Sequence, residues 1–119
     1  MTLSHTMIAP EYSSPVLALL ADLVRINSVN PAYDGGQSEA GMVNYLEEYF
    51  RRHSIETWQQ EALPGRPNLI ARLPGRDNSR RLIFEAHTDT VYVGGMEIPP
   101  FDPVISEGRL YGRGSCDTK

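Results

Sequence analysis

A histidine and an aspartate, His87 and Asp89, directly follow the apolar run LIFEA at residues 82–86. Side chains two positions apart on extended backbone point to the same side, so these two can act together. A metal-binding imidazole usually donates a hydrogen bond from its other ring N–H to a carboxylate. Asp89 could accept that hydrogen bond, or it could bind a metal itself. A polar strand end, in which Asp89 caps a turn, explains the same residues without a metal.

A second segment with potential chemistry is LYGRGSCDTK at residues 110–119. Gly112 and Gly114 allow the backbone to turn tightly just before Asp117. A carboxylate has two oxygens and can bridge two metal ions about 3.5–4 Å apart. The alternative is a glycine-rich turn in which Asp117 caps the N-terminus of a helix.

The single cysteine, Cys116, offers a different chemistry. With His87 as its base, it could act as a thiol nucleophile. A lone cysteine among small residues is more often buried and inert, and no adjacent cation or helix N-terminus predicts a reactive thiolate. One cysteine cannot form a disulfide within the chain, which favours a reducing compartment.

The two segments together, HTDTV at residues 87–91 and PPFDPVISEGRLYGRGSCDTK at residues 99–119, resemble a family of zinc-dependent amidohydrolases and metallopeptidases. That family includes acetylornithine deacetylase, succinyl-diaminopimelate desuccinylase, aminoacylase and carboxypeptidase G. The resemblance is strongest over residues 82–119, and it extends loosely to the early helix and the SVNP loop. It implies that His87 is a terminal ligand of one metal, that Asp117 bridges two metals, and that Asp89 is the catalytic residue that orients His87.

The resemblance also implies a function. It points to a metal-dependent hydrolase that cleaves amide bonds of N-acyl amino acids or small peptides, with two Zn²⁺ ions, or Co²⁺ or Mn²⁺ in their place. The general-base glutamate, the remaining ligands and a lid or dimerisation domain are expected beyond Lys119. We therefore expect an inactive N-terminal fragment of an enzyme whose complete form is a homodimer. A small non-catalytic α/β binding domain is the alternative.

Two further features follow from the same comparison. Glu85 shares a side with His87 and Asp89 by alternation, but it does not match the general base of the family. The resemblance also implies a cis peptide between Asp117 and Thr118, which is rare because a non-proline cis bond costs about 3–4 kcal/mol.

Two amphipathic helices are predicted before these segments. Ser14 and Pro15 suit the N-cap and first position of a helix over residues 15–26. A second helix is expected over residues 38–53, with apolar residues on one face and Glu39 directed outward. The loop between them contains the sequence SVNP.

Strands are predicted after the helices. They comprise residues 55–60, residues 68–73 after a turn at 64–67, a buried central strand at 82–86, and a hairpin of residues 104–106 and 109–111 around Glu107 and Gly108. Helices followed by strands indicate an α/β layer structure, with helices packed on a mixed sheet. This would be the truncated N-terminal part of a zinc-exopeptidase-like catalytic domain.

Length and composition favour one domain, with a loose arm at residues 1–13 and the catalytic part at residues 14–119. A net charge of −4 without a basic stripe argues against nucleic acid as a partner. The sequence shows no signal peptide and no apolar run long enough for a membrane, so we expect a cytoplasmic protein.

Overall fold

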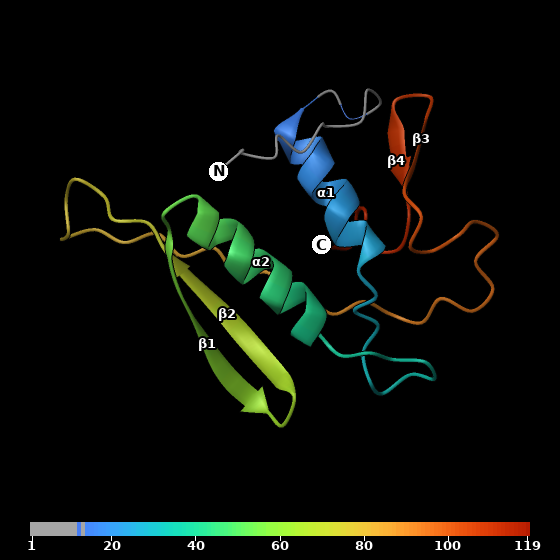
Figure 1. The fold of residues 1–119 in the computed structure, drawn as a ribbon, viewed down its shortest axis with the longest axis horizontal. Coiled ribbons are helices and arrows are strands. Elements are labelled where there is room, and N and C mark those ends of the chain that lie inside the picture. The colour runs from blue at the N-terminus through green and yellow to red at the C-terminus, as the bar shows by residue number, and fades with distance from the viewer. Residues whose placement is uncertain (1–11, 13) are drawn as a thin grey trace, which may run out of the picture.

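The computed structural model describes Tyr12 and residues 14–119 (Figure 1). The expected arm at residues 1–13, apart from Tyr12, lies outside the described residues. The elements in chain order are α1 (Pro15–Arg25), α2 (Ala40–Arg52), β1 (Glu56–Leu63), β2 (Arg66–Arg72), β3 (Val104–Ser106) and β4 (Arg109–Tyr111). The chain is therefore α/β, as the sequence predicts.

Helix α1 begins as the sequence predicts. The Ser14 backbone is extended, its side chain accepts a hydrogen bond from the backbone N–H of Leu17 at 3.2 Å, and Pro15 occupies the first turn. The helix ends at Arg25, one residue before the predicted end. At 11 and 13 residues, neither described helix is long and apolar enough to cross a membrane.

Helix α2 begins at Ala40, two residues later than predicted, because Ser38 has a φ of +69° and cannot continue a right-handed helix. The outward position predicted for Glu39 is wrong. Its side chain is buried, and both carboxylate oxygens accept hydrogen bonds from the guanidinium of Arg66. Helix α2 packs on β1 and β2, and this contact joins the residue just before the helix to the first residue of β2.

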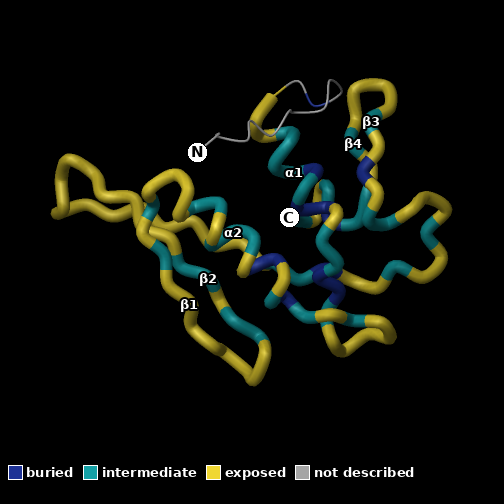
Figure 2. Tube along the Cα trace, viewed as in Figure 1, coloured by how far each residue is buried: buried dark blue, intermediate teal, exposed yellow. Residues whose placement is uncertain are grey.

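The core lies where α1, the SVNP loop and the start of α2 meet. Its buried apolar residues include Ala21, Leu23, Val24, Val29, Met42 and Val43 (Figure 2). Tyr45 of α2 donates a hydrogen bond at 2.8 Å to the carboxylate of Asp22 on α1. Burial and this contact raise the pKa of Tyr45 to about 12, because both disfavour the charged phenolate.

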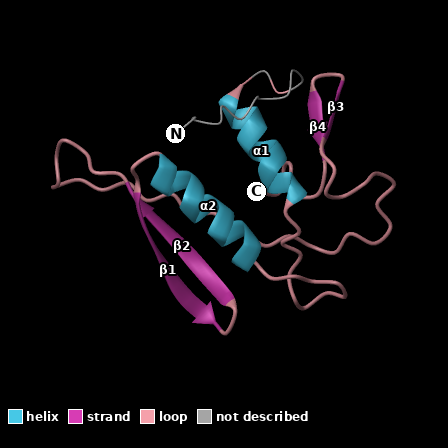
Figure 3. Ribbon diagram, viewed as in Figure 1, coloured by secondary structure: helices cyan, strands magenta, loops and turns pink. Residues whose placement is uncertain are grey.

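The strands form two separate antiparallel pairs, β1 with β2 and β3 with β4 (Figure 3). The β3–β4 hairpin has the predicted bounds, and its turn residues Glu107 and Gly108 both have positive φ. Strand β2 begins at Arg66, earlier than predicted, because the turn before it is tight at Gly65, whose φ is +71°. The single mixed sheet that the sequence suggested is not formed by the described residues.

The predicted central strand at residues 82–86 is wrong. Residues 71–87 are all exposed, and the side chains of Leu82, Ile83 and Phe84 are 79%, 84% and 88% exposed. A strand needs a neighbour to satisfy its backbone, and within residues 14–119 no strand pairs with this run. The nearest pairing is a single parallel bridge between Val29 and Thr90.

Candidate metal centre

His87 and Asp117, predicted as metal ligands from separate segments, lie together. Nε2 of His87 is 3.1 Å from Oδ1 of Asp117, although 30 residues separate them in sequence. Both side chains are accessible, with 53% of His87 and 91% of Asp117 exposed. An imidazole nitrogen and a carboxylate oxygen therefore meet at a surface that a cation can reach.

Asp89 contacts the other ring nitrogen of His87. Nδ1 lies 2.9 Å from the carbonyl oxygen of Asp89 and 3.3 Å from its Oδ1, so the expected proximity of the two residues is observed. The carbonyl of Asp89, and then the carboxylate of Asp117, raise the pKa of His87 above its ordinary value. In the neutral ring, an Nδ1–H that donates to Asp89 leaves the lone pair of Nε2 on the Asp117 side.

Lys119 joins the turn that carries Asp117 to the end of α1 by hydrogen bonds. Its Nζ donates to the carbonyl oxygen of Leu23 at 3.0 Å and also to that of Ile26, at the C-terminal end of the helix. Burial lowers the pKa of Lys119 to about 8. Sequence reasoning did not assign this role to Lys119. The available signal was its place two residues after Asp117, as the lone lysine of the chain.

The expected cis peptide between Asp117 and Thr118 is absent, since no peptide bond in the described part of the chain is cis. The trans form has the lower intrinsic energy for a bond that does not precede proline.

The SVNP loop runs beside the HTDT segment. The backbone N–H of Thr90 donates to the carbonyl of Ser28, and the N–H of Asn30 donates to the carbonyl of Thr90, both at 2.9 Å. The side-chain amide of Asn30 donates to Oδ2 of Asp89 at 2.8 Å. Asn30 was not among the predicted site residues, although its loop was part of the family resemblance.

A pocket of about 280 Å³ opens beside these groups. Its polar lining comprises Glu39, Arg66, Asn68, His87, Thr88 and Asp89. The hydrogen bond from Arg66 holds the pKa of Glu39 below its ordinary value, so these two lining residues form an ion pair at neutral pH.

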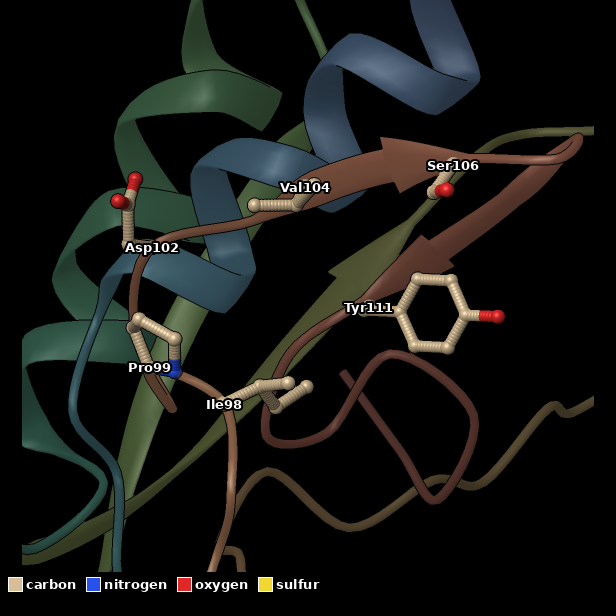
Figure 4. Close-up of a pocket in the computed structure, with 6 residues that line it drawn as sticks. All are labelled: Ile98, Pro99, Asp102, Val104, Ser106 and Tyr111. Atoms are coloured by element: carbon tan, nitrogen blue, oxygen red, sulfur yellow. The ribbon is translucent and has the colours of Figure 1, made fainter.

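A second pocket, of about 250 Å³, lies between the β3–β4 hairpin and the preceding loop (Figure 4). Apolar side chains such as Ile98, Val104 and Tyr111 predominate in its lining. It contains neither His87 nor Asp117, so it is separate from the candidate metal centre.

Cys116 is exposed, which corrects the expectation that it is buried. Among the described residues, no hydrogen bond joins Cys116 to His87, whose ring nitrogens face Asp89 and Asp117 instead. The geometry therefore gives no support to a cysteine nucleophile with His87 as its base.

Comparison with known proteins shows what these residues are similar to. Residues 83–119 match the model of peptidase family M20/M25/M40. A metallohydrolase of uncharacterised function from Methanocaldococcus jannaschii is 35% identical, over 85% of this chain and 28% of that protein. Succinyl-diaminopimelate desuccinylases from Gluconacetobacter diazotrophicus and a Janthinobacterium species are 37% and 38% identical, over 90% and 89% of this chain and 27% of each relative.

The chain thus spans between a quarter and a third of the length of these relatives, with a share of 27–28% in each. The family match covers both the HTDT segment and the Asp117 turn, the two segments that the fold brings into contact. Residues 83–119 therefore match peptidase family M20/M25/M40, and the chain is similar in sequence to a metallohydrolase and to desuccinylases over 27–28% of their length.

Proposed function

We propose that this chain is the part of a metal-dependent hydrolase that supplies one edge of its metal site. The proposed reaction is cleavage of the amide bond in an N-acyl amino acid or a small peptide. The observation that carries the proposal is the 3.1 Å contact between Nε2 of His87 and Oδ1 of Asp117, within the segment that matches the family. The names of the relatives, metallohydrolase and desuccinylase, support the same class of reaction.

The donor set fits zinc, which is bound by imidazole nitrogens and carboxylate oxygens. His87 and Asp117 would hold the metal, with Asp117 as the carboxylate that bridges two ions. Two donors make an incomplete site, because zinc usually takes four, or three with a water. Among the described residues, no group of three His, Cys, Asp or Glu side chains could hold a metal. The proposal therefore places the remaining ligands and the general-base glutamate outside the described residues.

When bound, zinc would polarise the amide carbonyl and lower the pKa of a water molecule. The residues of this chain prepare the site. Asp89 accepts the Nδ1–H of His87 through its carbonyl, with its carboxylate also in reach, and so fixes which ring nitrogen faces the metal. The pocket beside His87 gives the acyl group or the amino acid a place to bind.

The experiment is an assay of the protein encoded by the reading frame that contains these residues, with N-succinyl and N-acetyl amino acids as substrates. We expect hydrolysis that a chelator abolishes and that zinc, cobalt or manganese restores. His87→Ala and Asp117→Asn should remove activity, whereas His53→Ala, at the end of α2, should keep it. Cys116→Ala should also keep it. Hydrolysis that resists exhaustive chelation would refute the metal-dependent reaction.

A second candidate function is a small α/β binding domain without catalysis. The absence of a third metal donor among residues 12 and 14–119 favours it. The nucleotide sequence after the codon for Lys119 separates the two functions. An open frame that continues into further His, Asp and Glu ligands supports the enzyme, and a stop codon supports the binding domain.

A further inference from the structure

The carboxylate of Asp89 has a different partner on each oxygen. Oδ1 lies 3.3 Å from Nδ1 of His87, and Oδ2 accepts a hydrogen bond at 2.8 Å from the side-chain amide of Asn30. Rotation of the carboxylate away from Asn30 would also change its position against the imidazole. The orientation of His87 and the contact with Asn30 are therefore linked through one planar group.

The direction of the Asn30 amide is fixed by a second hydrogen bond. Its Oδ1 accepts from the backbone N–H of Ala32 at 2.9 Å, which makes an Asx turn. Because the oxygen is engaged by a donor, the nitrogen is the atom that faces Asp89. A flipped amide would place two acceptors against each other and would lose both bonds.

The backbone of Asn30 is also held against the HTDT segment. Its N–H donates to the carbonyl of Thr90, and the N–H of Thr90 donates to Ser28. Ser28, Val29 and Thr90 are each 2% exposed or less. A buried parallel bridge therefore carries the amide to Asp89, so the contact does not depend on a loosely held surface loop.

We propose that Asn30 is a positioning residue of the metal site: it holds the Asp89 carboxylate in the orientation that directs the Nδ1 edge of His87, and so aims Nε2 toward the metal. This inference rests on the proposed function for its consequence, which is metal affinity. The orientation of His87 is a property of the chain alone and is measurable without metal.

The first test measures the NMR signals of the histidine rings in the full chain, labelled at histidine and free of metal. The three histidines give three sets of signals, and His5 and His53 serve as internal references. Asn30→Ala should move the ring signals of His87 toward the averaged values of an unrestrained imidazole and weaken its contacts to residue 117. Asn27→Ala is the matched control, since Asn27 caps the same loop through the N–H of Val29.

The second test distinguishes action through Asp89 from a general effect on the loop. In an Asp89→Ala background, addition of Asn30→Ala should cause no further change at His87, because the intermediate group is already gone. Thermal unfolding of each variant shows whether the fold is retained. Equal effects of Asn30→Ala with and without Asp89, or equal effects of Asn27→Ala, would overturn the inference.

The third test compares the zinc affinities of the wild-type chain and Asn30→Ala by titration. Loss of groups that orient a ligand typically weakens metal affinity by about 10–100-fold, and we expect about 10-fold for Asn30→Ala because it acts one contact further out. Unchanged His87 signals together with unchanged zinc affinity refute the role of Asn30. If Asn30→Ala still releases His87 but the protein from the complete reading frame shows no metal-dependent hydrolysis, the positioning role stands and the proposed metal function fails.

Discussion

Lys119 donates a hydrogen bond through Nζ to the carbonyl oxygen of Leu23 at 3.0 Å, across 96 positions of sequence. The last carbonyls of a helix lack partners within the helix and carry partial negative charge, so an ammonium group stabilises them. The same side chain lies over the ring of Phe101, with Nζ 5.5 Å from its centroid. The ammonium group of Lys119 thus joins the Asp117 turn to α1, and the aliphatic part of the same side chain packs beside it.

Replacement Lys119→Met should lower the free energy of unfolding by about 1–2 kcal/mol. It keeps most of the apolar stem but removes a charged donor from partly buried carbonyls. Urea unfolding at pH 7 measures the loss, and Arg76→Met in an exposed loop is the control. Equal midpoints for the two variants would show that the ammonium group contributes nothing.

Gly114→Ala should destabilise the chain more than Gly65→Ala. Both glycines have positive φ, +85° and +71°, so each alanine incurs the left-handed backbone cost of roughly 1–2 kcal/mol. Only at Gly114 would the new Cβ also lie 2.6 Å from Cγ of Lys119, whereas the space around Gly65 is open. Thermal unfolding of both variants measures the difference, and equal losses would contradict the packing argument.

The ion pair of Glu39 and Arg66 predicts a pH dependence of stability. The pKa of Glu39 is below its ordinary value of 4.5 in the folded chain. Its contribution is therefore fully present above pH 4.5 and is lost as the pH falls through the folded pKa. Urea unfolding between pH 7 and pH 3 should show a steeper acid loss for wild type than for Glu39→Gln.

The control for that experiment is Glu56→Gln, which breaks the exposed pair with Arg72 on the β1–β2 hairpin. An exposed pair contributes little, so this variant should retain the acid loss of wild type. A Glu39→Gln profile parallel to that of wild type would exclude Glu39 as the source.

Zinc binding by the 119-residue chain should be weak and readily reversed by a chelator. Among the described residues, His87 and Asp117 are the two predicted metal ligands, too few for a zinc site, and the chain alone should hydrolyse no substrate. His87→Ala and Asp117→Asn should each reduce the binding further, whereas His53→Ala should leave it unchanged. Competition with a metal-sensing dye measures this, and stoichiometric zinc that resists the chelator would disprove it.

The exposed run at residues 82–84 should make the isolated chain prone to association. Three adjacent large apolar side chains form a patch that soluble proteins usually cover. The double replacement Ile83→Ser and Phe84→Ser should reduce light scattering without lowering the melting temperature, because neither side chain is buried. The control Leu73→Ser removes a similarly exposed residue outside the run and should have a smaller effect.

Local sequence was sufficient for the parts of the fold whose causes are local. The cap by Ser14 and the turn at Glu107 and Gly108 depend on neighbours within a few residues, and both were predicted correctly. The prediction of a strand at residues 82–86 was wrong, because an apolar run becomes a strand only where another strand pairs with it. The burial of Glu39 was not predicted for a similar reason, since its partner Arg66 is 27 positions away in sequence.

The candidate site shows the same division. The types and spacing of His87, Asp89 and Asp117 indicated metal chemistry, and the fold brings these residues together as expected. Their roles as ligands and orienting residue stay predictions. Asn30 could not be assigned from sequence, since Asp89 lies 59 positions away and the contact depends on the bridge between Val29 and Thr90.

That bridge between Val29 and Thr90 has a kinetic consequence. Bringing Val29 and Thr90 together closes a long loop of chain, and the entropy cost of closure grows with the logarithm of the loop length. Few contacts near the bridge offset this cost before the two residues meet. The α2–β1–β2 unit lies entirely between the two ends and is built from near neighbours. During refolding that unit should form first, and the contacts around His87, which depend on the bridge, should form last.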